Sequence, residues 1–187
     1  MDSLVSTDWL AQHLGEEDLV VVDCSWFMPA SGRSGRDEYL AAHIPGARFL
    51  DIDEVADKSN PAPHSLPSAL EFGSAMEQLG INRDDRIVVY DNSPVRTAAR
   101  GWFMFRHFGA GRVAILDGGF QKWLAEGRPT ESGEPMSRSG RFDAVERDET
   151  VTKEQLFDLS PAADADARLS KSNPFTAPGC AGMIENA

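Results

Sequence analysis

The chain has 187 residues, of which 41% are hydrophobic and 26% are charged. This balance is typical of a folded globular protein, and the length allows one domain plus the start of another. With 30 acidic and 18 basic residues, the net charge is −12. Such a charge is repelled by phosphate backbones and anionic lipids, so nucleic acids and membranes are not expected partners.

The N-terminal residues lack the basic start and apolar run of a signal peptide, and no apolar run approaches the roughly 20 residues of a membrane span. Two cysteines, Cys24 and Cys180, are too few for a disulfide framework, which favours a reduced, cytoplasmic protein. The four histidines show no metal-binding spacing, so we expect neither a zinc site nor a cofactor.

Strands and helices are predicted to alternate along the first 130 residues. Three short runs rich in β-branched residues are typical of buried parallel strands. Ser68 and Glu71 form a capping-box pattern before one of the helices. The expected elements in chain order are a helix at 7–14, a strand at 19–23, a helix at 37–43, a strand at 48–51, a helix from 68 to 80, a strand at 86–90, a helix from 95 to 109, a strand at 113–116 and a helix at 120–124. This succession predicts an α/β fold with a central parallel sheet and helices on both faces.

The C-terminal third differs in composition. Residues 131–150 are polar and rich in Gly, Ser and Pro, which is typical of an extended linker. The pattern of 151–156 repeats that of 5–10, so residues 151–187 are expected to hold the start of an incomplete second domain and an irregular tail. The first domain is expected to span residues 1–130.

Three motifs carry a family resemblance. Residues 39–47, YLAAHIPGA, resemble the Y-x-x-x-H-I-P-G-A signature of rhodanese domains, and residues 116–123, LDGGFQKW, resemble its C-terminal signature. The spacing between 51–53 (DID) and 64–67 (HSLP) is similar to that in the N-terminal domain of the two-domain 3-mercaptopyruvate and thiosulfate sulfurtransferases. The resemblance implies a rhodanese-like domain over roughly 3–130, apparently truncated early in the second domain. It also implies transfer of sulfane sulfur from 3-mercaptopyruvate or thiosulfate to a thiol or cyanide.

The loop after the strand at 86–90 departs from the family pattern. In that family a cysteine opens this loop, where backbone N–H groups stabilise a thiolate and then a persulfide. Asp91 stands at that position, although Arg96 matches the family's arginine. Because a carboxylate cannot carry a persulfide, we expect a pseudo-active loop and no activity from this chain alone; Asp91 has the simpler alternative role of capping the next helix. The loop residues are Asp91, Asn92, Ser93, Pro94, Val95, Arg96 and Thr97.

The resemblance also places an auxiliary catalytic pair on Asp53 and His64, which assists the second domain's cysteine loop through a serine. An aspartate can fix the tautomer of an imidazole for proton relay, which requires a contact of roughly 2.6–3.2 Å. The alternative is that His64, in the proline-rich loop 57–67, is an ordinary exposed histidine. His43 and Cys24 are expected to be structural, and Cys180 lacks a basic neighbour that would activate it.

Two functions remain open from the sequence. The first is one half of a sulfurtransferase, whose partner is a second rhodanese domain or a second copy joined through an exposed interdomain face. The second is a non-catalytic rhodanese-fold module that binds a partner or an anion through the Asp91 loop or serves regulation. A cysteine-based phosphatase of related fold is excluded, because it also needs a cysteine in this loop.

Overall fold

The computed structural model of the protein describes residues 1–135, 138–148 and 150–151. Residues Met1–Arg147 form one compact unit. In this unit five strands pair side by side in the order β1-β5-β4-β2-β3, and every pairing in the sheet is parallel. The strands are β1 (Leu4–Val5), β2 (Leu19–Asp23), β3 (Arg48–Phe49), β4 (Arg86–Tyr90) and β5 (Val113–Leu116).

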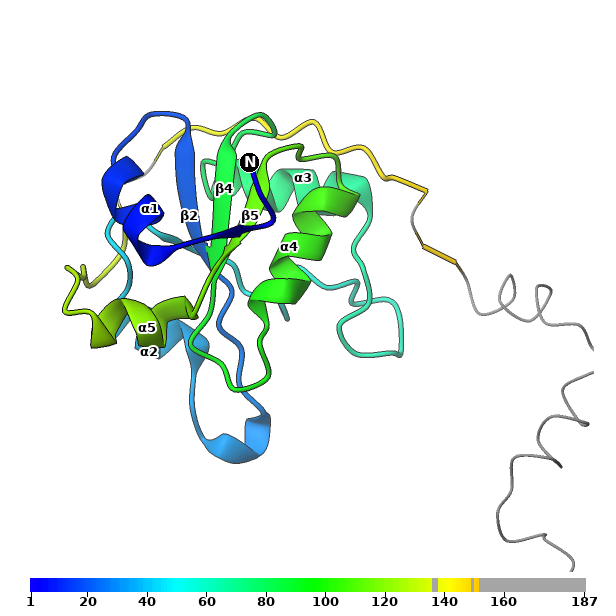
Figure 1. The fold of residues 1–187 in the computed structure, drawn as a ribbon. Helices are drawn as coiled ribbons and strands as arrows, with labels where there is room; N and C mark the ends of the chain where they lie inside the picture. Colours follow the sequence, from blue (N-terminus) through cyan, green and yellow to red (C-terminus); the bar gives the residue numbers. More distant parts are fainter. Residues whose placement is uncertain (136–137, 149, 152–187) are drawn as a thin grey trace, which may run out of the picture. The chain divides into compact units, whose positions relative to one another are not determined.

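Helices cover both faces of the sheet, as the sequence predicts. Figure 1 shows α3 and α4 on one side of the sheet and α1, α2 and α5 on the other. The helices are α1 (Thr7–His13), α2 (Gly35–Ala41), α3 (Ala69–Gln78), α4 (Ala98–His107) and α5 (Gly119–Ala125), with a 3₁₀ turn at Pro29–Ser31. The predicted α/β fold is therefore confirmed.

Successive side chains of the strands pack alternately into two separate hydrophobic cores, one on each face of the sheet. Val20 and Val22 of β2 pack with Phe72 of α3 and Phe105 of α4, while Val21 joins the core of the opposite face. Because successive strand residues point to opposite faces, a strand buried on both sides consists of apolar residues throughout. The continuous apolar runs in the sequence thus follow from the two-sided cover.

Element boundaries differ from the prediction at a few places. The edge strand β1 was not predicted, and β3 is shorter than the strand expected at 48–51. The helix expected from Val95 begins at Ala98, because Arg96 has a left-handed backbone with φ 58°. The capping box is confirmed: Ser68 and Glu71 satisfy each other's backbone N–H groups at the start of α3.

The segment expected to be a linker packs on the domain. Its described residues form neither helix nor strand apart from an isolated bridge between His43 and Glu131, yet Phe142 is buried and stacks edge-on against Phe72 in the core. The compact unit thus reaches Arg147. The expected repeat and tail at 152–187, with Cys180, lie outside the described residues.

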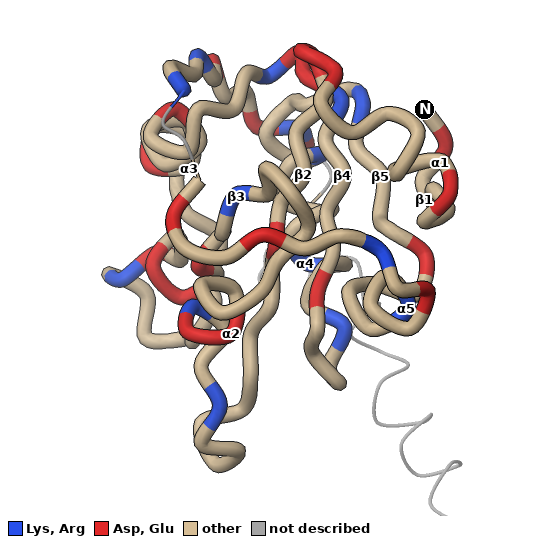
Figure 2. The backbone as a smooth tube through the Cα atoms, turned by 90° about the vertical axis from the view of Figure 1, so that its left-hand side faces the viewer, with Lys and Arg blue, Asp and Glu red and all other residues tan. Residues whose placement is uncertain are grey.

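The acidic excess is not gathered on one face. Figure 2 shows acidic and basic segments interspersed over the strands, helices and loops of the described part. Many of these charges pair across the surface, as Arg86 does with Asp18 and Glu16. The structure therefore shows no basic face that would bind a polyanion in the part of the chain that it describes.

Candidate functional site

The candidate site lies where three neighbouring strands end. Trp26 follows β2, Asp53 follows β3, and the loop 91–97 follows β4. Because β2 pairs with both β3 and β4 in parallel, their carboxyl ends meet at one edge of the sheet. This edge is where open α/β sheets place their ligand sites.

Asp53 and His64 contact each other in the way the sequence predicts. The Nδ1–H of His64 donates to Oδ1 of Asp53 across 3.0 Å. This contact fixes the tautomer of the neutral imidazole, since Nδ1 holds the proton and Nε2 is left as an acceptor. The His64 side chain is 37% exposed and that of Asp53 is 53% exposed. A group from another domain or molecule could therefore reach the imidazole from solvent.

Trp26 also contacts this pair, although no sequence pattern indicated it. Its indole Nε1–H donates to Oδ2 of Asp53 at 2.8 Å, so both carboxylate oxygens are engaged. The Trp26 and His64 rings meet edge to face, with their centroids 5.1 Å apart. Carboxylate and imidazole are thus held in one orientation by a third side chain from the end of β2.

The proline-rich loop 57–67 folds back to place His64. Leu66 packs against the core, and the backbone N–H of Asp57 donates to the carbonyl of Ser65 at 3.2 Å. His64 has a left-handed backbone with φ 57°. Arg100 of α4 reaches the loop and donates from Nη2 to the carbonyl of His64 at 2.6 Å.

Asp91 caps α4 in place of a nucleophile. One carboxylate oxygen accepts the backbone N–H of Ser93 at 3.1 Å and the other accepts that of Ala98 at 2.6 Å. Asp91 is 5% exposed, and this burial raises the pKa of its carboxyl above the usual value. The carboxylate therefore satisfies one backbone N–H group of the loop and one at the start of α4, which agrees with the capping interpretation.

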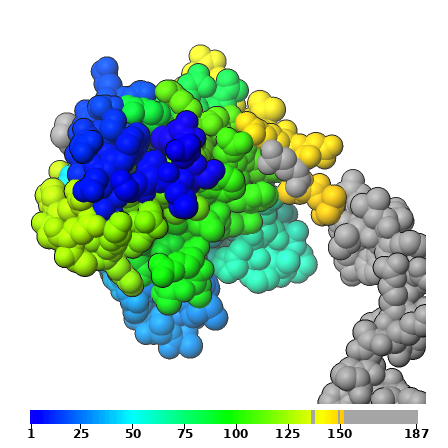
Figure 3. Space-filling model, viewed as in Figure 1, coloured from blue at the N-terminus to red at the C-terminus, as the bar shows by residue number. Residues whose placement is uncertain are grey.

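The loop after β4 is tied to the segment after β2. The Ser93 hydroxyl donates to the carbonyl of Trp26, and the Asn92 amide donates to Glu38 of α2 at 3.2 Å. Figure 3 shows these segments together at one end of the domain, the loop after β4 in green and the segment after β2 in light blue. The loop 91–97 is thus part of a fixed surface.

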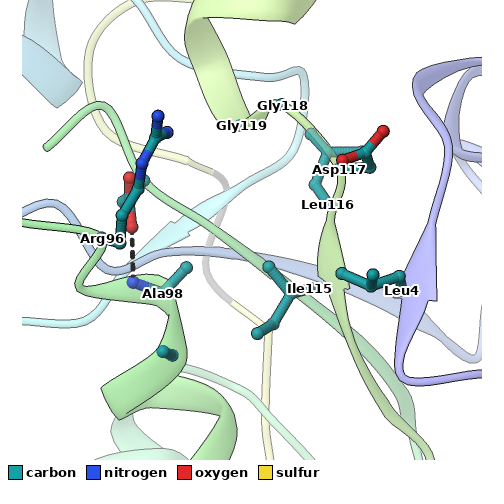
Figure 4. Close-up of a pocket in the computed structure, with 10 residues that line it drawn as sticks. Leu4, Arg96, Ala98, Ile115, Leu116, Asp117, Gly118 and Gly119 are labelled. Carbon is teal, nitrogen blue, oxygen red and sulfur yellow. Dashed lines mark hydrogen bonds between the residues drawn. The ribbon is translucent and has the colours of Figure 1, made fainter. Parts of the chain in front are cut away.

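A pocket of about 330 Å³ lies beside this loop. Figure 4 shows Arg96 from the loop and Asp117 from the end of β5 on opposite sides of it. Gly119 borders the pocket with φ 57°, and a Cβ at this position would lie 2.6 Å from the carbonyl oxygen of Asp91. Neither Asp53 nor His64 lines the pocket, so the histidine pair stands on an open surface apart from it.

Two residues expected to be structural are buried. Cys24 is fully buried, and its burial raises the pKa of the thiol well above the usual value, so this thiol resists ionisation. His43 is 1% exposed, and its Nδ1–H donates to the carbonyl of Tyr39 at 2.7 Å. Both take part in packing and hydrogen bonding within the domain.

No three His, Cys, Asp or Glu side chains in the described part of the chain are grouped closely enough to hold a metal ion. No helix among those residues combines the length and the apolar character needed to cross a membrane.

Comparison with known proteins identifies the family. The model of the rhodanese-like domain matches residues 6–126, so the chain belongs to that family. The 3-mercaptopyruvate sulfurtransferase of Escherichia coli is 35% identical over 183 residues, covering 91% of this chain and 65% of that protein. A thiosulfate/3-mercaptopyruvate sulfurtransferase of Arabidopsis thaliana is 41% identical over 150 residues, covering 78% of this chain and 40% of that protein. The thiosulfate sulfurtransferase of Bos taurus is 40% identical over 163 residues, covering 83% and 54%.

Solved structures agree with this assignment. The crystal structure of SseA from Escherichia coli, described as a 3-mercaptopyruvate sulfotransferase, matches with a TM-score of 0.77 and 34% identity. The match covers 91% of this chain and 62% of SseA. The family resemblance drawn from the motifs is confirmed. The chain spans 40–65% of the length of the curated relatives described above.

Proposed function

We propose that this chain supplies the non-catalytic half of a sulfurtransferase, which moves sulfane sulfur from 3-mercaptopyruvate or thiosulfate to a thiol or cyanide. The observation that carries the proposal is the oriented Asp53–His64 pair. The Nε2 atom of His64 has no partner among the residues that the structure describes. The chain offers an imidazole ready to exchange a proton, but the only thiol in that part is the buried Cys24. The sulfur-carrying cysteine would therefore belong to a second rhodanese domain.

Sulfur transfer from 3-mercaptopyruvate requires a proton donor near the sulfur-carrying cysteine. When a cysteine thiolate takes the sulfur of 3-mercaptopyruvate, an S–S bond forms and the C–S bond breaks. The electron pair of the C–S bond remains on carbon as the enolate of pyruvate, which must then take up a proton. His64 can pass that proton through the serine that the family resemblance places in the second domain, while Asp53 stabilises the imidazolium.

The chain alone should have no sulfurtransferase activity, because Asp91 cannot form a persulfide. The assay measures thiocyanate release from thiosulfate and cyanide, and pyruvate release from 3-mercaptopyruvate. We expect no turnover above the protein-free control. Turnover that persists in a Cys24→Ala/Cys180→Ala variant would contradict this assignment, and turnover that disappears with Cys180→Ala alone would move the nucleophile to the C-terminal segment.

A chimera tests the proposed function itself. The compact unit Met1–Arg147 replaces the segment of the Escherichia coli 3-mercaptopyruvate sulfurtransferase that aligns with it. We expect the chimera to release pyruvate, while the remaining part of the Escherichia coli enzyme alone does not. A chimera that is folded by circular dichroism but inert would argue against the proposal.

The partner would cover the edge of the sheet near the loop 91–97. Leu4 lines the pocket beside this loop and is 59% exposed. Val95 lies in the loop itself and is 49% exposed. We propose that a second rhodanese domain or a second copy of this chain packs here. Light scattering that gives a monomer at every concentration, together with no binding to a cysteine-bearing rhodanese domain, would argue against this partner.

A non-catalytic binding or regulatory module is the second candidate. The capping role of the Asp91 carboxylate favours it, because this loop is built without a nucleophile. The two candidates differ in the chimera: a binding module leaves it inert, while a sulfurtransferase half supports pyruvate release.

A further inference from the structure

Arg100 has an unusual place in the fold. It lies on α4, is partly buried, and makes no ion pair with any carboxylate in the described part of the chain. Its Nε is buried without a hydrogen-bond partner, and burial lowers the pKa of the guanidinium from its ordinary value. A partly buried charge without a counter-charge costs free energy, so we expect the contacts of Arg100 to show a function that explains its presence here.

Arg100 makes a hydrogen bond to the backbone of His64. Its Nη2 donates to the carbonyl of His64 at 2.6 Å. His64 has a φ of 57°, a region that residues other than glycine seldom adopt, although histidine tolerates it better than most. Something must therefore hold the loop in this conformation, and the charged donor of Arg100 acts on the peptide group that follows the left-handed residue.

The opposite side of the pair is held by Trp26. Its indole N–H fixes Asp53, and its ring meets the imidazole edge to face. Trp26 therefore orients the carboxylate, while Arg100 fixes the backbone that carries the imidazole. With both contacts in place, Nδ1 of His64 faces Asp53 and Nε2 is left free.

We infer that Arg100 is a positioning residue for the Asp53–His64 pair: it locks the backbone of His64 so that the imidazole stands between Asp53 and solvent. This inference rests on the proposed function for its catalytic meaning, but its structural part can be tested separately. Arg100 acts through His64 and has no contact with a substrate in this account.

The test uses nuclear magnetic resonance on the full chain. The signal is the nuclear Overhauser effect between the rings of Trp26 and His64, which requires the loop to be folded back. Arg100→Met keeps a long apolar stem and removes the donor. We expect this variant to lose the inter-ring signal while its far-ultraviolet circular dichroism stays unchanged.

Arg106→Met is the matched control. Arg106 lies on the same helix and also donates to a backbone carbonyl, that of Gly111 at 3.1 Å. We expect it to keep the inter-ring signal. Arg100→Lys, which retains a charged donor, should keep at least half of it. Arg100→Leu, which also has no donor, replaces Arg100→Met if the latter does not fold.

Two results would overturn the inference: an inter-ring signal that survives in a folded Arg100→Met or Arg100→Leu variant, or one that is lost equally in Arg106→Met. In the active chimera, Arg100→Met should lower kcat roughly tenfold with KM changed less than about twofold, and should add nothing to His64→Gln. If His64→Gln itself leaves the chimera fully active, the proposed function fails, while the resonance comparison still decides the positioning role.

Discussion

The carboxylate of Asp91 accepts the backbone N–H of Ala98 at 2.6 Å and so caps α4 from seven residues before it. The family resemblance places a cysteine at this position, at the start of the loop after β4. With Asp91 in place of that cysteine, the anion near the start of α4 is a hydrogen-bonded carboxylate and not a reactive thiolate.

Removal of this cap should destabilise the domain. Asp91→Ala leaves the N–H groups of Ser93 and Ala98 without their acceptor, and we expect the free energy of unfolding to fall by about 1–2 kcal/mol. Asp91→Asn keeps one acceptor oxygen and should cost less. Urea denaturation measures both. Asp117→Ala is the control, since this residue borders the same pocket but makes only an exposed ion pair with Lys122. Equal stability of Asp91→Ala and the control would contradict the capping role.

Asp23 should make stability depend on pH. Its burial at the end of β2 raises the pKa of the carboxyl to about 6, although the hydrogen bond from Ser25 opposes the shift. Below about pH 3 the carboxyl is protonated in both states, so it has no effect on stability. Between about pH 4 and 6 the unfolded chain releases the proton while the folded domain retains it, so folding becomes progressively less favourable.

The substitution Asp23→Asn removes this penalty and keeps an oxygen for the N–H of Ser25. The stability of Asp23→Asn relative to the natural chain should therefore rise by about 3 kcal/mol from pH 3 to pH 7. Urea denaturation of both proteins at several pH values measures the difference. A difference that does not change with pH would show that Asp23 ionises normally in the folded domain.

Gly101 lets α4 approach the sheet closely. A Cβ at this position would lie 2.4 Å from Sγ of Cys24, so Gly101→Ala should destabilise the domain by about 1–3 kcal/mol through overpacking. Cys24→Ala removes the sulfur, and in that background Gly101→Ala should cost less by about 1 kcal/mol or more. Thermal or urea unfolding of the four proteins in this cycle gives the coupling. Additive effects would mean that the helix moves away instead.

The buried strands could be predicted to the residue, because they combine an unbroken apolar run with abrupt polar ends. Residues 19–23, 86–90 and 113–116 are strands in the structure with those bounds. The edge strand Leu4–Val5 has only two residues, too few for any pattern. Phe142 could not be assigned to the core, since a single aromatic residue in a polar segment has no periodicity to reveal its burial.

The candidate site was predictable only in part. Motif spacing indicated Asp53 and His64, and the structure places them in contact. Trp26 and Arg100 were missed, because they reach the pair from β2 and α4, and no local pattern connects residues so far apart in the chain. The late start of α4 was missed because Val95 fits the helical spacing, while the left-handed backbone of Arg96 and the cap from Asp91 decide where the helix begins.

If His64 exchanges a proton during sulfur transfer, kcat for pyruvate release by the chimera must depend on its imidazole. His64→Gln is compared with His13→Gln, which changes a histidine that is also partly exposed and in contact with a tryptophan, Trp9. We expect His64→Gln to lower kcat by about a hundredfold or more and His13→Gln to leave it unchanged. Equal kcat values in the two variants would contradict the proton-transfer role of His64.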